Sequence, residues 1–256
     1  MTRERSKGKR KRQKLPLRFR LFVAIALLIL AGFGLYYFLS LPIFRITEVT
    51  VSGTQMLVPE EIKDLSGVPL AANLFLTSFA RTRDNLRKIT AIKNFHLYRI
   101  PPGTVVINVT ERKPLAILVF ENKSAVIDED GYILNRNPGL TLNVPNMTEL
   151  PVISGLGTGE YDGEERIDPQ ASKLIFEIIT ELSSLLGSRH LQLATGGSGQ
   201  ISFSLDDILL VKVGRNEGIK HKMEVFKALL PEIAGRWDKV AYVDVRYPES
   251  PVIRFK

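Results

Sequence analysis

The 256-residue sequence contains no cysteine and only three histidines. Thiol catalysis, disulfide bonds and cysteine-ligated metal sites are therefore excluded, so the fold must be stabilised by packing. The histidines, His96, His190 and His221, are scattered and lack the spacing of a metal-binding motif such as HExxH. The G-x-S-x-G motif of a serine nucleophile is also missing. We therefore expect a protein that is not an enzyme and that binds no cofactor.

Charged residues are absent from residues 21–41, an apolar run of 21 residues. A helix of this length spans roughly 30 Å, which matches the hydrocarbon core of a bilayer. A cleaved signal peptide would have a shorter apolar run that ends in a small-x-small cleavage site, and this run has no such site. We therefore predict an uncleaved transmembrane helix at residues 21–41.

Positive charge is concentrated before this run. Residues 1–20 hold ten Lys/Arg and one acid, whereas the other 236 residues hold 25 Lys/Arg and 26 acids. Basic runs can bind nucleic acid, but directly before a span they indicate topology first, because positive segments stay in the cytoplasm. We therefore predict a cytoplasmic tail at residues 1–20, an exported remainder and no nucleic-acid partner. The predicted topology determinants are Lys9, Arg10, Lys11, Arg12, Arg18 and Arg20.

Residues 43–112 are predicted to form a first exported domain with the element order β-α-α-β-β. The first strand alternates apolar and polar residues, and Gly53 ends it. Pro59 suits the first turn of a short helix, which Gly67 ends. Helices on one side of a three-stranded sheet are expected. The predicted elements are a strand at 44–52, helices at 58–67 and 81–94, and strands at 95–100 and 104–110.

Residues 113–256 are predicted to form a second, β-rich domain of antiparallel strands with two helices, so the fold class is α+β. Asp168 and Pro169 form a helix start, with an N-cap followed by proline in the first position. A second helix begins at Asn216, and Pro231 is expected to kink or end it. Residues 135–167 are expected to be mostly loop. The predicted strands are 116–120, 124–127, 132–134, 190–194, 200–205, 208–213, 239–247 and 252–255.

Two glycine-rich stretches, 155–159 and 196–199, are not expected to bind phosphate. A phosphate loop leads from a strand into a helix, and neither stretch is followed by one. The acids Asp162, Glu164 and Glu165 lack the spacing of a calcium loop and are interpreted as part of a solvated loop. The sequence therefore indicates no small-molecule substrate.

The C-terminal strand is the strongest candidate for a functional site. A terminal strand commonly lies at a sheet edge, where unpaired backbone groups can accept a strand of another chain. An ordinary edge protected by Arg254 and Lys256 is the alternative interpretation.

The whole arrangement resembles the FtsQ/DivIB family of bacterial cell-division proteins. Residues 44–53 (FRITEVTVSG) are similar to the first strand of that family's POTRA domain, and residues 105–116 are similar to its end. Residues 211–215 (VKVGR) and 242–247 (YVDVRY) resemble landmarks of its second domain. Residues 248–251 (PESP) replace the Asp/Asn-x-Gly type of turn that the family often has, so the register of the last strand is left open.

The resemblance implies a scaffold of the division complex (divisome) in the bacterial inner membrane, concentrated at the septum. By the resemblance, the C-terminal strand edge would bind FtsB and FtsL, two single-span division proteins, and link them to septal peptidoglycan synthesis. The POTRA domain and the span would contact other division proteins. A membrane-anchored periplasmic enzyme acting on peptidoglycan is the alternative function. The implied partner-binding residues are Arg246, Tyr247, Val252, Arg254, Phe255 and Arg215.

Overall fold

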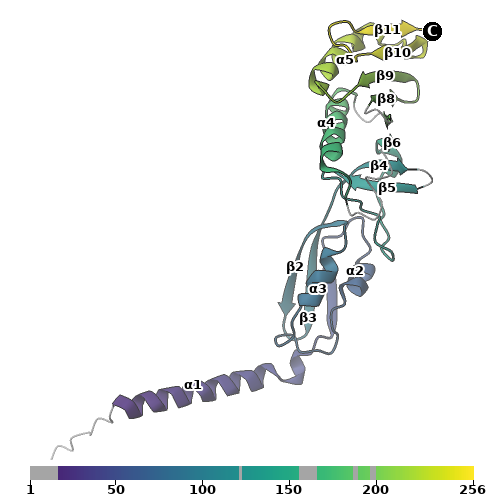
Figure 1. Cartoon of the computed structure of the whole chain (residues 1–256). Helices are drawn as coiled ribbons and strands as arrows, with labels where there is room; N and C mark the ends of the chain where they lie inside the picture. The colour runs from purple at the N-terminus through teal and green to yellow at the C-terminus, as the bar shows by residue number, and fades with distance from the viewer. Residues whose placement is uncertain (1–16, 121–122, 156–165, 187–189, 197–199) are drawn as a thin grey trace, which may run out of the picture. The chain divides into compact units, whose positions relative to one another are not determined.

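The computed structural model describes residues 17–120, 123–155, 166–186, 190–196 and 200–256 (Figure 1). The chain divides into two compact units. The first comprises Met1–Glu48, Pro69–Thr77 and Arg99–Thr104, and the second comprises Val49–Val68, Ser78–Tyr98 and Val105–Lys256. Several residues of the sequence analysis lie outside the described residues: Lys9, Arg10, Lys11, Arg12, Asp162, Glu164, Glu165 and most of both glycine-rich stretches.

The N-terminal helix α1 runs from Leu17 to Leu39, four residues earlier than predicted at its start and two at its end. Arg18 and Arg20 therefore lie in its first turn rather than before it. Its large apolar side chains are exposed from Phe19 to Phe38. Among the described residues, one helix, Arg18–Leu39, is long and apolar enough to cross a membrane.

The predicted order β-α-α-β-β of residues 43–112 is confirmed. Its elements form a three-stranded sheet in the order β1-β3-β2, so β1 and β2 are the outer strands. On β3 the side chains of Val105, Ile107 and Val109 are buried on one face, as the alternation predicts. The elements are β1 (Glu48–Ser52), α2 (Pro59–Ser66), α3 (Ala80–Arg87), β2 (Ile92–Ile100) and β3 (Thr104–Glu111).

The prediction for α3 was wrong at its C-terminal end, because the helix stops at Arg87 instead of continuing to residue 94. The early end of α3 is explained by the side chain of Asn137, which lies 50 positions after Arg87 in the sequence. Its side-chain nitrogen donates to the carbonyl oxygen of Lys88 at 2.8 Å, and its side-chain oxygen accepts from the backbone nitrogen of Thr90 at 3.0 Å. These bonds satisfy backbone groups that a longer helix would have paired internally.

The second domain contains an eight-stranded sheet in the order β11-β10-β9-β8-β7-β6-β4-β5. Two helices, α4 (Pro169–Leu186) and α5 (Ile219–Ile233), accompany it. Asp168 caps α4 as predicted, since its carboxylate accepts from the backbone nitrogens of Gln170 and Ala171. The strands are β4 (Pro114–Phe120), β5 (Lys123–Asp128), β6 (Val152–Ser154), β7 (Leu191–Thr195), β8 (Ile201–Leu205), β9 (Leu209–Gly214), β10 (Val240–Asp244) and β11 (Val252–Phe255).

The expectation of antiparallel strands is correct for only part of this sheet. Among the described strands, the pairs β4–β6, β6–β7 and β9–β10 are parallel. Parallel neighbours need a long crossover connection, which is usually a helix, and here α4 connects β6 to β7 and α5 connects β9 to β10. The second domain therefore contains a sheet with both parallel and antiparallel pairs, and part of this sheet is built from β-α-β units.

One local prediction needs correction, because residues 132–134, expected to be a strand, form only isolated bridges to Ile127 and Arg166. Residues 135–167 are mostly loop where the structure describes them, as expected, but the short strand β6 lies within them, between β4 and β7 in the sheet. Pro231 was expected to kink or end α5; it does not end the helix, which continues to Ile233.

A candidate partner-binding edge

The C-terminal hairpin forms one end of the eight-stranded sheet. β11 pairs antiparallel with β10, with Ile253 opposite Val243 and Phe255 opposite Val240. This pairing settles the register that residues 248–251 left open. Because β11 is the outermost strand, its other edge has no neighbour in the sheet as described, and backbone groups along that edge are available to a further strand.

Three large side chains of this hairpin are exposed. Tyr247 is 72% exposed, and Val252 and Phe255 are each 50% exposed. Ile253, between them on β11, is half-buried and packs against the hydrophobic core. The edge is therefore held to the domain by Ile253 while large apolar groups remain uncovered beside it.

A groove of about 510 Å³ lies between the end of α5 and β11. Ile253 and Phe255 line it from the strand. The guanidinium carbon of Arg236 lies 5.9 Å from the centre of the Phe255 ring, within the range of a cation–π contact. Sequence reasoning missed the helical side of this groove. Its other lining residues are Leu229, Glu232, Arg236 and Pro251.

Arg246 is already engaged within the hairpin. Its Nη2 donates to Asp244 Oδ2 at 2.6 Å, and its Nε lies 3.0 Å from each oxygen of the same carboxylate. These hydrogen bonds hold the pKa of Asp244 below its usual value and raise that of Arg246. Gly214 packs beside the aliphatic part of the Arg246 side chain. Arg246 therefore shapes the turn that carries Tyr247.

Arg215 is separated from the edge strand. It follows β9, and β10 lies between β9 and β11. Its side chain is exposed, and its carbonyl oxygen accepts a hydrogen bond of 2.9 Å from Nζ of Lys222. Burial lowers the pKa of Lys222. The structure thus places Val252, Arg254 and Phe255 together on β11, with Tyr247 in the preceding turn and Arg215 apart.

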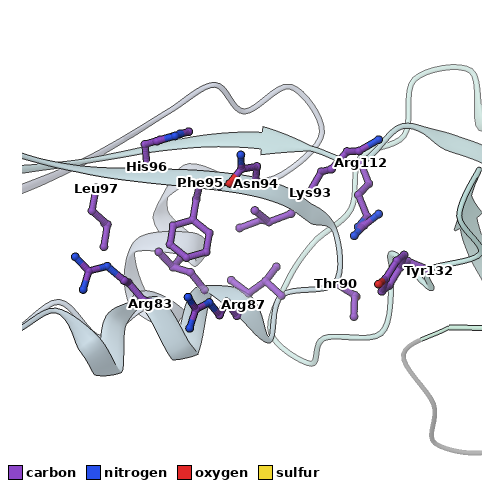
Figure 2. Close-up of a pocket in the computed structure, with 13 residues that line it drawn as sticks. Arg83, Arg87, Thr90, Lys93, Asn94, Phe95, His96, Leu97, Arg112 and Tyr132 are labelled. Atoms are coloured by element: carbon purple, nitrogen blue, oxygen red, sulfur yellow. Dashed lines mark hydrogen bonds between the residues drawn. The ribbon is translucent and has the colours of Figure 1, made fainter.

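A second groove, of about 560 Å³, lies beside β2 (Figure 2). Figure 2 shows Arg83 and Arg87 projecting from α3 on one side, with Phe95 of β2 between strand and helix. Residues 81–99 hold six Lys/Arg and one acid. Since β2 is an outer strand of its sheet, this groove combines an available strand edge with positive charge.

Arg112 and Tyr132 close one end of this basic groove. The Arg112 guanidinium lies 3.7 Å from the centre of the Tyr132 ring and donates to Asp128 at 2.8 Å. Lys93 also has a carboxylate partner, Glu129, at 3.0 Å, and this bond raises the pKa of Lys93. The Lys93 pair is exposed to solvent, so it contributes little to stability. The Arg112 side chain is therefore fixed in a largely buried ion pair, whereas the exposed Lys93 side chain can leave Glu129 and bind another acidic group.

Two family models match the chain. Residues 44–112 match the POTRA domain, FtsQ-type, and residues 116–246 match the C-terminal domain of the cell division protein FtsQ/DivIB. The chain belongs to the FtsQ/DivIB family. It is therefore a cell-division protein with an N-terminal apolar helix, and residues 44–112 form its POTRA domain.

Relatives from distant bacteria agree with this assignment. The cell division protein FtsQ of Streptomyces collinus is 25% identical over 210 residues, which cover 81% of this chain and 76% of that protein. The cell division protein DivIB of Clostridium tetani is 24% identical over 221 residues, covering 84% and 81%. FtsQ of Rickettsia felis is 26% identical over 164 residues, covering 64% and 58%.

The FtsQ/DivIB domain model stops at residue 246, before the edge strand of this chain. In the structure this edge strand, β11, lies at the end of the sheet and pairs with β10. Among the described residues there is no group of three or more His, Asp or Glu side chains placed to hold a metal ion. The uncovered edge of β11 and the two grooves are the candidate binding surfaces of this family member.

Proposed function

We propose that the chain is a non-enzymatic scaffold of the division complex, anchored in the inner membrane by α1 and concentrated at the septum. In this proposal residues 1–20 are a cytoplasmic tail, residues 43–112 and 113–256 are two periplasmic domains, and the basic residues before the apolar run fix the orientation. The excess of Lys/Arg before α1 supports this topology, because such residues stay on the cytoplasmic side. The proposed determinants are Lys9, Arg10, Lys11, Arg12, Arg18 and Arg20.

The proposed partner of the β11 edge is FtsB, with FtsL bound in the same assembly, and the scaffold thereby links both to septal peptidoglycan synthesis. The observation that carries this proposal is the outermost position of β11 beside a groove and exposed aromatic side chains. Backbone hydrogen bonds along an edge supply affinity that depends little on sequence, and side chains beside it supply selectivity. We assign selectivity to Tyr247 and Phe255, since aromatic residues dominate many interfaces.

The remaining proposed site residues have different roles. Val252 and Arg254 alternate with Ile253 and Phe255 along β11, so they project to the opposite face and would contact the flank of an added strand. Arg246 acts through its bonds to Asp244, and Arg215 lies at the periphery. The basic groove beside β2, together with the span, is the proposed contact for other division proteins.

Replacing Tyr247 and Phe255 by alanine is expected to weaken FtsB binding while leaving the domain folded. Both side chains are exposed, so their truncation removes contact area without opening the core. We expect each variant to lose about tenfold in affinity, equivalent to about 1.4 kcal/mol. Pull-down of the full chain by FtsB, with Trp237 fluorescence as the folding check, measures this loss.

Tyr98 provides a matched control, because it is another exposed aromatic residue, on β2 of the POTRA domain. Tyr98→Ala is expected to bind FtsB as the parent chain does. Unchanged binding by the Tyr247→Ala/Phe255→Ala double variant would show that FtsB does not use this edge.

A further inference from the structure

Large apolar side chains are exposed on the compact unit that contains α1, outside the helix itself. Ile43 is 65% exposed, Leu70 59%, Ile100 48% and Leu76 47%. They come from three separate segments, namely the exit from α1, the loop Pro69–Thr77 and the hairpin tip Arg99–Thr104. Exposed apolar side chains gathered on one unit indicate a surface that is covered in use.

The loop Pro69–Thr77 is attached to the end of the membrane helix. Nδ2 of Asn73 donates to the carbonyl oxygen of Leu39, the last residue of α1, at 2.7 Å. The backbone nitrogen of Leu74 donates to the carbonyl oxygen of Phe44 at 2.7 Å. Asn73 therefore lies within one hydrogen bond of the point where α1 ends.

Aromatic rings continue this attachment. The ring of Phe44 contacts Phe38 of α1 on one side and Phe75 of the loop on the other, with centroid distances of 5.4 and 5.1 Å. The hairpin tip is held to the same loop by Arg99, which donates to the carbonyl oxygens of Phe75 and Thr77 at 3.0 and 2.9 Å. Loop, tip and helix end thus form one bonded cluster.

We propose that this surface, defined by Ile43, Leu70, Leu76 and Ile100, enters the interfacial region of the lipid bilayer on the side where α1 emerges. The proposal rests on the proposed membrane anchoring of α1. A residue bonded to the last turn of a spanning helix lies at the depth of the lipid headgroups, where apolar side chains are stabilised and polar backbone groups remain hydrated. Chain connectivity therefore selects lipid, rather than a protein partner, as the cover.

Contact with lipid has a consequence for the scaffold. The hydrogen bond from Asn73 and the ring contacts of Phe44 attach the loop to the end of α1. Additional apolar contacts of the loop and the hairpin tip with lipid would further restrict tilting of the unit about its anchor. The surface would thus hold the membrane-proximal unit against the bilayer.

The absence of cysteine permits a direct test by single-cysteine spin labelling of the full chain in phospholipid vesicles. The test variants are Leu70→Cys and Leu76→Cys. Leu35→Cys, in α1, is the membrane reference, and Ile208→Cys, half-exposed between β8 and β9, is the water reference. Collision of each label with oxygen, which concentrates in lipid, and with a water-soluble nickel chelate is measured by electron paramagnetic resonance.

We expect the labels at positions 70 and 76 to favour oxygen over nickel, as the label at 35 does, and the label at 208 to favour nickel. If 70 and 76 behave like 208 while 35 behaves as a membrane site, the lipid contact is overturned and the anchor stands. If 35 also behaves like 208, the anchor itself fails, and this inference with it. If the labels at 70 and 76 were shielded from the nickel chelate only after a partner protein is added, the surface would bind protein instead of lipid, and the proposal would be overturned.

Discussion

Replacing Asp128 by alanine is expected to destabilise the second domain by about 3–5 kcal/mol, because it removes one partner of a buried ion pair. The side chains of Asp128 and Arg112 are only 2% and 13% exposed. Oδ1 of Asp128 also accepts from the backbone nitrogens of Asp130 and Tyr132. Among the described residues, Nε of Arg112 already lacks a hydrogen-bond partner. The substitution would leave the guanidinium with the longer contact to Asp130 at 3.4 Å and the face of the Tyr132 ring.

Urea unfolding of the full chain in detergent measures this loss. The chain has one tryptophan, Trp237, which packs against the core of the second domain and therefore reports its unfolding. Glu129→Ala is the matched control, because Glu129 is the next residue and its ion pair with Lys93 is about half-exposed. The control is expected to change stability by less than about 1 kcal/mol. Equal effects of the two substitutions would refute the structural role of the Arg112–Asp128 pair.

The parts of the fold that local signals specify could be predicted from the sequence. The uncharged apolar run predicts α1, Pro59 and Gly67 bound α2, and Asp168 starts α4. In each case the residues that determine the element lie within it or next to it. For β11 the alternation is visible in the sequence, and its outermost position agrees with the expectation for this strand.

The parts that depend on distant residues could not be predicted. The strand β6 has only three residues, too few for a pattern, and is held in place by β4 and β7 on its two sides. The end of α3 depends on Asn137, and the groove beside Phe255 depends on Arg236, in the turn that follows α5. Tertiary contacts formed these features, and no local propensity encodes them.

The parallel pairings are an intermediate case. Around α5 the sequence places a predicted helix between two predicted strands, and such an order favours a β-α-β unit. Around α4 the preceding strand, β6, lies within an expected loop, so this second unit could not be recognised from the sequence. For the candidate site, the sequence therefore identified the edge strand. It did not identify the residues of α5 that line the groove, because their position depends on how the β-α-β crossover packs against the sheet.

Replacing Gly53 by alanine is expected to disrupt the POTRA sheet, at a cost of about 2–5 kcal/mol from backbone strain and overpacking together. Gly53 follows β1 and has φ +85°, a conformation that side chains disfavour. An added Cβ would also collide with the carbonyl oxygen of Val109 on β3. Hydrogen–deuterium exchange of peptides that cover Glu48–Ser52 and Thr104–Glu111 measures the effect, because both strands would open more often.

Gly139 separates the two causes, since it has φ +79° but no atom within 4 Å of the position that a Cβ would occupy. Gly139→Ala should therefore show the backbone cost alone, about 1–2 kcal/mol, and leave exchange in β1 and β3 unchanged. The difference between the two variants isolates the contact with Val109. If Gly53→Ala exchanged no faster than Gly139→Ala in these strands, the close approach of β1's end to β3 would be wrong, and the register of the POTRA sheet would need revision.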